Sequence, residues 1–338
     1  MRENWINSEK EFLAKLFFKM GNTNFLWRDD AIIVPIDCNN SLLYSIDNAE
    51  QIFNTGNKTK DMRLYGRWAA SLIASDIIAC GVMPNGLALD LGIKDKDEAD
   101  CKHFIEGVLD VCSHYNLRYE GGNINTTNST SGVAWGYADN SKIIRREGAQ
   151  IGDIILVTCD LGVGWANRLL CNFNKQVIVP NYKDFPVINP SMFKEIWKLN
   201  AIHCGMDLTD GIIEFAYEIR DRTGYGVVFD PQPNNSKAIN LAASILNIPE
   251  KAFRFDPGYD TPFAHGWCIA PNKINDIIEI FNRYNSHYTI MGTVERGDSG
   301  VSVAHNNKNI PLPRYSDDII INRGNIEMWF EQIYPIFK

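Results

Sequence analysis

The stretch SLIASDIIACGVMP, residues 71–84, is the most informative part of the sequence. Its apolar side chains recur at helical spacing and predict a buried helix over residues 67–80, which the following glycine and proline end. One carboxylate, that of Asp76, lies inside this apolar run. Its burial costs free energy unless it pairs with a cation or binds a metal. Arg63 or Arg67 could supply the cation, so a structural and a functional role for Asp76 both stay open.

Strand-like and helix-like runs alternate on both sides of this helix. Before residue 145, strands are expected over residues 31–37, 42–47, 86–91 and 132–139, and further helices over 7–20 and 97–115. After residue 152, strands are expected near 154–158, 226–230, 265–270 and 288–294, with helices between them. The polar, glycine-bearing segment between these units predicts a domain boundary, with domains over residues 1–145 and 146–338. The fold class predicted is α/β, or α+β mixed.

The composition excludes several classes of protein. With 338 residues, 45% of them hydrophobic and 22% charged, the chain is neither disordered, fibrous nor a disulfide-stapled miniprotein. The net charge is −8 and no Lys/Arg cluster stands out, which argues against a nucleic-acid or anionic-membrane partner. The eight cysteines form no CxxC pair, and no apolar run approaches about 20 residues. We therefore expect a cytoplasmic protein with reduced thiols.

Further carboxylates lie at the ends of predicted elements. Asp30 precedes a hydrophobic strand, Asp47 ends the next one, and Asp207 and Asp210 lead into a helix. Each has an ordinary explanation by itself: a turn, a solvated strand end, or a helix cap formed by Thr209 or Asp210. Carboxylate oxygens are also the ligands that Mg²⁺ prefers, and Mg²⁺ accompanies the phosphates of nucleotides.

Six motifs that follow one another in order identify a family. They are RDDA at 28–31, SID at 45–47, SDIIACGVMP at 75–84, GGN at 121–123, REGAQIGD at 146–153 and MDLTDG at 206–211. A seventh, PGYD at 257–260, matches only in part. Their order and spacing resemble the superfamily of aminoimidazole ribonucleotide synthetase and selenophosphate synthetase, and within it thiamine-monophosphate kinase. The resemblance extends over residues 25–295.

The resemblance implies a fold, cofactors and a set of site residues. The fold would have two domains, with the N-terminal domains of two subunits pairing through their sheets into a barrel-like dimer core. ATP and Mg²⁺ would bind in a cleft beside that sheet. The motif positions assign the metal to Asp30, Ser45, Asp47, Asp76, Asp207 and Asp210, and the nucleotide to Gly121, Gly122, Asn123, Arg146 and Thr209. Asp30 and Asp210 would be the catalytic residues.

The departures from the kinase pattern concern mainly the acceptor. The stretch that carries a histidine in the kinases reads QIFN here, at 51–54, and an acidic residue of the kinases falls at Tyr259. Asn54 and Tyr259 are therefore the candidate substrate residues. Asn123 replaces an aspartate of the GGD turn. The first glycine of the GDD start is an arginine, and the threonine of the TD strand end is an isoleucine. We therefore predict that thiamine monophosphate is not the native acceptor. Trp267 and His265 are further pocket candidates, while packing is the alternative for His265.

The predicted function is ATP- and Mg²⁺-dependent phosphotransfer to a small metabolite. The acceptor atom could be a phosphate or hydroxyl oxygen, as in the superfamily's kinases, or an amide or carbonyl oxygen, as in its ring-closing synthetases. Such chemistry requires positioning and charge neutralisation more than covalent help from the protein. The alternative is a catalytically decayed nucleotide-binding or scaffold protein of the same fold, which the three motif departures favour.

Overall fold

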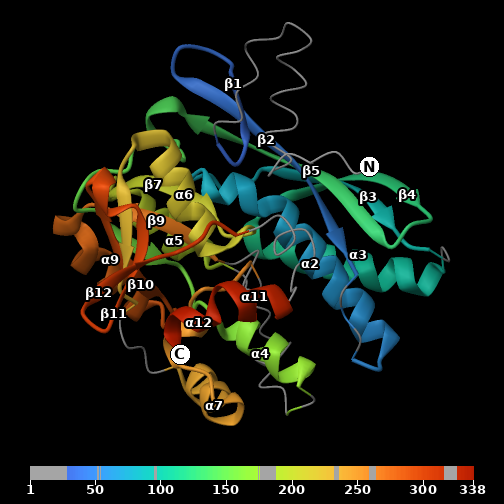
Figure 1. Cartoon of the computed structure of the whole chain (residues 1–338). Coiled ribbons are helices and arrows are strands. Elements are labelled where there is room, and N and C mark those ends of the chain that lie inside the picture. The colour runs from blue at the N-terminus through green and yellow to red at the C-terminus, as the bar shows by residue number, and fades with distance from the viewer. Residues whose placement is uncertain are drawn as a thin grey trace, which may run out of the picture.

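The computed structural model describes residues 29–338, apart from 52, 54, 95–96, 174, 176–187, 232–235, 259–263 and 316–325. The helix expected over residues 7–20 lies outside these residues, as do the two candidate substrate residues, Asn54 and Tyr259. The described chain forms two sheets with helices around them (Figure 1), in agreement with the predicted mixed α/β class.

The first sheet has five strands in the order β1-β2-β5-β3-β4. Their bounds are Ile32–Pro35 (β1), Asn40–Glu50 (β2), Gly86–Gly92 (β3), Arg118–Asn125 (β4) and Ser129–Asp139 (β5). β3 and β4 run parallel, and the other neighbouring strands run antiparallel. Side chains alternate between the two faces, so that Leu43 and Ser45 of β2 are buried while Ile46 is exposed.

Two helices cover the buried face of the first sheet (Figure 1). They are α2 (Lys58–Ala79) and α3 (Glu98–Tyr115), and a short helix η1 (Asn140–Lys142) follows β5. α2 and α3 can approach closely because glycines lie where they cross. A Cβ at Gly66 would lie 1.9 Å from the carbonyl oxygen of Phe104, and a Cβ at Gly107 would lie 2.1 Å from the carbonyl oxygen of Arg63. The sheet's opposite face carries exposed apolar side chains, among them Ile46 and Tyr137.

The second sheet has seven strands in the order β12-β11-β8-β10-β6-β9-β7. Their bounds are Ile154–Val157 (β6), Ile202–Asp207 (β7), Gly226–Phe229 (β8), His265–Ile269 (β9), Thr289–Glu295 (β10), Val301–His305 (β11) and Lys308–Pro311 (β12). The accompanying helices are α4 (Val163–Asn172), α5 (Pro190–Trp197), α6 (Gly211–Thr223), α7 (Lys237–Leu246), α8 (Glu250–Phe253), η3 (Pro271–Lys273), α9 (Ile274–Arg283), η4 (Gly297–Ser299), α11 (Ile326–Gln332) and α12 (Tyr334–Phe337).

The two sheets share a hydrophobic core around α2. Buried side chains of β6 and β9, namely Leu156, Trp267 and Ile269, belong to the same cluster as the apolar residues of α2 and α3. Residues of α2 also contact β7 directly. The carboxyl-terminal half of α2, which carries Asp76, is therefore fixed against both sheets.

Several elements differ from the sequence-based expectation. β4, β7, β11 and β12 were not expected, and α2 begins at Lys58 rather than near residue 67. Gly121 and Gly122 lie within β4 and do not form the predicted turn, although both have positive φ angles, 99° and 151°. A Cβ at Gly122 would lie 1.7 Å from the carbonyl oxygen of Leu89, so only glycine lets β4 pair with β3 there. None of the helices in the described part of the chain has the length and apolarity needed to cross a membrane.

Candidate metal and nucleotide site

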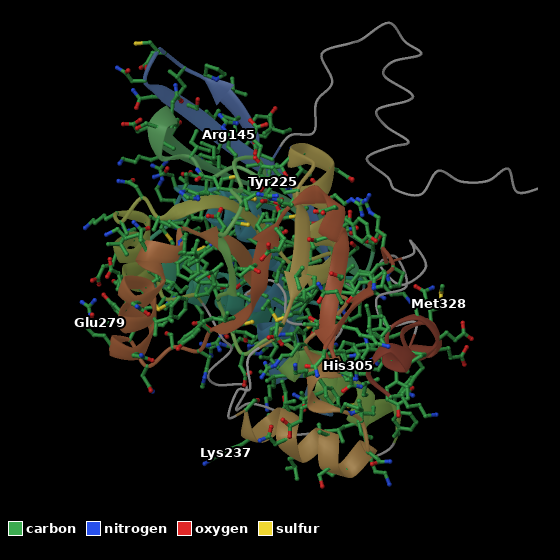
Figure 2. All side chains as sticks on the ribbon, turned by 60° about the vertical axis from the view of Figure 1, so that its left-hand side comes forward. Arg145, Tyr225, Lys237, Glu279, His305 and Met328 are labelled. Atoms are coloured by element: carbon green, nitrogen blue, oxygen red, sulfur yellow. The ribbon has the colours of Figure 1, made fainter. Side chains whose placement is uncertain are left out.

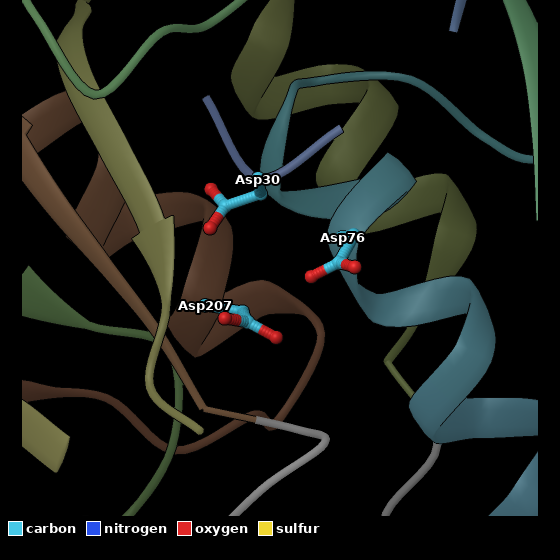
Figure 3. A group of neighbouring side chains, drawn as sticks. All are labelled: Asp30, Asp76 and Asp207. Atoms are coloured by element: carbon cyan, nitrogen blue, oxygen red, sulfur yellow. The ribbon is translucent and has the colours of Figure 1, made fainter. Parts of the chain in front are cut away.

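Three carboxylates from separate parts of the chain meet at the junction of the two sheets (Figure 3). Asp30 lies just before β1, Asp76 lies in α2, and Asp207 ends β7. Each offers one oxygen, and these three oxygens lie within 4.8 Å of one another. Among the described residues, this is the one group of three or more His, Cys, Asp or Glu side chains close enough to share a metal ion.

Asp207 is held by hydroxyl groups on both of its oxygens. Ser75, which is fully buried in α2, donates from Oγ to Oδ2 at 3.1 Å. Thr209, just beyond β7, donates from Oγ1 to Oδ1 at 3.2 Å. Because one donor lies in α2 and the other lies just beyond β7, the carboxylate at the end of β7 has a fixed position relative to α2.

Arg146 supplies the positive charge at this cluster. Its guanidinium donates to Oδ1 of Asp30 through Nε at 2.9 Å and also through Nη2. Its Nη1 lies 3.7 Å from Oε2 of Glu218 in α6. The neighbouring Asp29 accepts from Nη1 of Arg145 at 2.7 Å and from the backbone N–H of Arg146 at 3.0 Å. In Figure 2, Arg145 lies beside β1 and β2, at the opposite end of the molecule from Lys237.

Burial and the crowding of acids dominate the electrostatics of the cluster. Burial, followed by the charges of Asp207, Asp30 and Asp47, raises the pKa of Asp76 well above its ordinary value, against the opposing effect of Arg146. Burial also raises the pKa of Asp207, which Arg146 opposes and Asp210 reinforces. Three crowded carboxylates beside one guanidinium are an oxygen-rich, anionic donor set, and this set fits a divalent cation such as Mg²⁺.

The remaining residues predicted to bind metal lie around this core. Asp47 and Asp210 are near enough to raise the pKa values of Asp76 and Asp207, respectively. The hydroxyl of Ser45 donates to the carbonyl oxygen of Ile73 in α2 at 3.3 Å. Asp210 occupies the N-cap position of α6, but its side chain makes no capping hydrogen bond. The capping explanation for that carboxylate is therefore wrong in this structure.

Other predicted residues lie elsewhere. Gly121, Gly122 and Asn123 lie on β4, an edge strand that β5 and β3 separate from β2. His265 and Trp267 are fully buried in β9, where both pack against Phe193. They belong to the core, so the pocket prediction for these two is wrong and the packing alternative for His265 is confirmed.

The two arginines considered from the sequence as partners of Asp76 lie elsewhere. Arg63 and Arg67 both bind Asp110 of α3 and not Asp76. Near Arg146, His203 contacts Asp153 at 2.9 Å, and the buried Cys204 thiol donates to the carbonyl oxygen of Arg146. Sequence reasoning also missed Glu218. Glu218 and Arg222 are four residues apart, and this spacing predicts an ion pair along one helix. It does not predict the contact of Glu218 with Arg146.

Comparison with known proteins gives consistent relatives. Residues 28–137 match the family described as AIR synthase related protein, N-terminal domain. Over 291 residues the chain is 25% identical to a thiamine-monophosphate kinase of Buchnera aphidicola, which covers 83% of this chain and 88% of the relative. A thiamine-monophosphate kinase of Haemophilus influenzae is 28% identical over 178 residues, 51% of this chain and 53% of the relative.

Solved structures share the fold. The thiamine monophosphate kinase of Aquifex aeolicus aligns with a TM-score of 0.69 at 21% identity, covering 90% of this chain and 99% of that one. AaThiL complexed with AMPPCP and TMP aligns with a TM-score of 0.70 at 23% identity, covering 92% and 98%. These alignments confirm the predicted fold class, and with the family match they confirm the resemblance predicted from the ordered motifs.

Proposed function

We propose that this chain, whose residues 28–137 match the AIR synthase related family, is an ATP-dependent enzyme that transfers a phosphoryl group to a small-molecule acceptor. The observation that carries the proposal is the group formed by Asp30, Asp76 and Asp207 beside the buried Arg146. The thiamine-monophosphate kinases among its relatives support the ATP-dependent class.

Each residue of the site has a role in this proposal. Asp30, Asp76 and Asp207 hold Mg²⁺, with Ser45, Asp47 and Asp210 supplying further oxygens around them. Bound Mg²⁺ neutralises phosphate oxygens and so favours phosphoryl transfer. Arg146 provides a fixed cation for the phosphates, and Thr209 orients Asp207. We assign Asp210, whose side chain makes no capping hydrogen bond, and Asp30 to the reacting groups.

The nucleotide's other contacts and the acceptor are inferred from motif positions. We assign Gly121, Gly122 and Asn123 to the nucleotide, and Asn54 and Tyr259 to the acceptor pocket. Since Asn54 and Tyr259 carry neither the histidine nor the acid of the kinase pattern, the acceptor is a small metabolite other than thiamine monophosphate. A phosphate, hydroxyl, amide or carbonyl oxygen could each accept the phosphoryl group.

Titration calorimetry with a non-hydrolysable ATP analogue tests the proposal. We expect the wild-type chain to bind the analogue only when Mg²⁺ is present, and Asp76→Asn to lose that binding. Asp110→Asn is the matched control, because Asp110 also contacts side chains of α2 but pairs there with two arginines. Absence of binding by the wild type, with or without Mg²⁺, would remove the basis of the proposal.

The alternative function, a nucleotide-binding scaffold without turnover, is favoured by the loss of an aspartate at Asn123. ADP release separates the two functions. Binding of the analogue, together with ADP release from ATP when a panel of small acceptors is added, supports the enzyme. Analogue binding with no ADP release from any acceptor supports the scaffold.

We also propose that the chain forms a homodimer through the open face of its first sheet. Strand register places Ile32 and Val34 of β1 on the same face as Ile46 of β2 and Tyr137 of β5, and all four are exposed. Apolar side chains gathered on one sheet face are typical of a surface that a partner covers. Sedimentation velocity should show a dimer for the wild type and a monomer for Ile46→Glu. A wild-type monomer would contradict this assignment.

A further inference from the structure

The buried Arg146 contacts acids from two different elements. Asp30, just before β1, accepts hydrogen bonds from Nε and Nη2 of the guanidinium. Oε2 of Glu218 in α6 lies 3.7 Å from Nη1. The side chains of Arg146 and Glu218 are only 8% and 12% exposed, so solvent screens this pair weakly. Burial disfavours the charged guanidinium, but Asp30, Glu218 and Asp207 outweigh it and raise the pKa of Arg146.

Glu218 is itself oriented by the next turn of α6. Nε of Arg222 donates to Oε2 of Glu218 at 2.9 Å, which is the same oxygen that faces Arg146. The spacing of four residues places the two side chains on one face of the helix. Asp30, Arg146, Glu218 and Arg222 thus form a chain of alternating charge that leads from the carboxylate cluster to α6.

The two acids have different chemical surroundings. Asp30 belongs to the three-carboxylate group that fits a divalent cation, so a cation and the guanidinium would share its oxygens. Glu218 lies outside that group. An arginine whose one acidic partner also binds a cation needs a second acid to stay oriented, because its flexible side chain otherwise loses its fixed geometry.

We infer that Glu218, supported by Arg222, is a positioning residue that holds the Arg146 guanidinium at the phosphate side of the site while Asp30 binds the metal. This inference rests on the proposed function, since it assigns Arg146 to the nucleotide. It adds a residue that the ordered motifs do not contain, because Glu218 lies beyond the MDLTDG segment on α6.

A double-mutant cycle tests whether Glu218 acts through Arg146. The affinity for the non-hydrolysable ATP analogue with Mg²⁺ is measured for the wild type, Glu218→Gln, Arg146→Gln and the double variant. We expect Glu218→Gln alone to weaken analogue binding about tenfold. In a chain that already carries Arg146→Gln, we expect Glu218→Gln to weaken it no further. Glu218→Asp keeps the charge and should recover most of the affinity. An unchanged affinity in Glu218→Gln, or equal weakening in both backgrounds, would overturn the inference.

Glu214→Gln is the matched control on the same helix. Glu214 lies one turn before Glu218, is buried, and pairs with Arg314 rather than with Arg146. We expect this variant to lower the thermal unfolding midpoint while leaving the analogue affinity unchanged. Equal loss of affinity in both variants would assign the effect to the stability of α6 and overturn the inference. A wild type that binds no analogue overturns the proposed function, and this inference with it. A wild type that binds with Mg²⁺ while Glu218→Gln binds equally well overturns the inference alone.

Discussion

Each half of α2 takes part in a cluster that contains a buried or half-buried aspartate, and the two aspartates have different surroundings. In the first half, Arg63 and Arg67 both bind Asp110 of α3, at 2.9 and 2.7 Å. In the second half, Asp76 faces the carboxylates of Asp30 and Asp207. Two cations meet one acid at the first position, whereas three acids meet one guanidinium at the second. The first cluster fastens two helices together, and the second crowds carboxylate oxygens into a set that fits a cation.

The pKa shifts express the same contrast. Burial would raise the pKa of Asp110, but hydrogen bonds from Arg63 and Arg67 outweigh it and lower that pKa. For Asp76, burial and the neighbouring carboxylates all raise the pKa. Asp110 and Asp76 therefore differ in the charges of their neighbours, which shift their pKa values in opposite directions.

The largest expected effect is on turnover. Asp207→Asn removes a charge from the three-carboxylate group but keeps an oxygen and the shape, and should lower Mg²⁺-dependent ATP turnover by about a hundredfold or more. Asp110→Asn should leave turnover within about twofold, because its partners lie outside the three-carboxylate group. ADP release at saturating Mg²⁺ measures both. Equal losses in the two variants would contradict the distinction between the clusters.

In the absence of metal, Asp110→Asn and Asp76→Asn should change the free energy of unfolding in opposite directions. Asp110→Asn breaks ion pairs with two arginines and should lower the free energy of unfolding by about 1–2 kcal/mol. Asp76→Asn removes repulsion among crowded acids and should raise it by about 1 kcal/mol. Urea denaturation in the presence of a chelator measures both changes. If Asp76→Asn destabilises the metal-free chain as much as Asp110→Asn does, the acids of the second cluster do not repel one another and the comparison does not hold.

The pH dependence of stability gives a smaller effect with a defined sign. Because folding raises the pKa of Asp76, the folded chain binds more protons than the unfolded chain above about pH 4. The free energy of unfolding of the metal-free wild type should therefore fall, relative to Asp76→Asn, as the pH rises from about 4 through the raised pKa. Folding lowers the pKa of Asp110, so the pH dependence has the opposite sign. The contribution of Asp110 to the free energy of unfolding is lost as the pH falls below its ordinary pKa. Urea midpoints across this pH range, with and without Mg²⁺, measure the difference, which Mg²⁺ should reduce.

Local sequence was sufficient for much of the fold and for the identity of the acids. The apolar run around Asp76 predicts α2, and the ordered motifs select Asp30 and Asp207, which the fold brings together with Asp76. Local sequence was insufficient for contacts between distant segments. Ser75 and Asp207 are 132 positions apart, so nothing nearby in the chain indicates their hydrogen bond. The partner of Arg63 was missed for a similar reason, since the close approach of α3 at Gly107 brings Asp110 within reach.

Strand β4 was missed because of glycine chemistry. Consecutive glycines usually indicate a turn, but Gly121 and Gly122 keep positive φ angles inside a strand. The pairing of β3 with β4 shifts register between Leu87 and Leu89, next to these glycines. An irregular strand of this kind depends on its neighbour more than on its own sequence, so the pattern of side chains could not reveal it.

The smallest expected effect concerns Asn123, where the kinase pattern has an aspartate. Asn123 is exposed on edge strand β4, outside the three-carboxylate group. Asn123→Asp keeps a side-chain oxygen at this position assigned to the nucleotide, and the exposed charge that it adds is screened by solvent. The Mg²⁺ dependence of analogue binding should therefore change by less than about threefold. Titration of the analogue at several Mg²⁺ concentrations measures this change. A gain of about tenfold would instead mean that the metal site extends to β4 when nucleotide is bound. In that case the three-carboxylate group would be one part of a larger site that spans the first sheet.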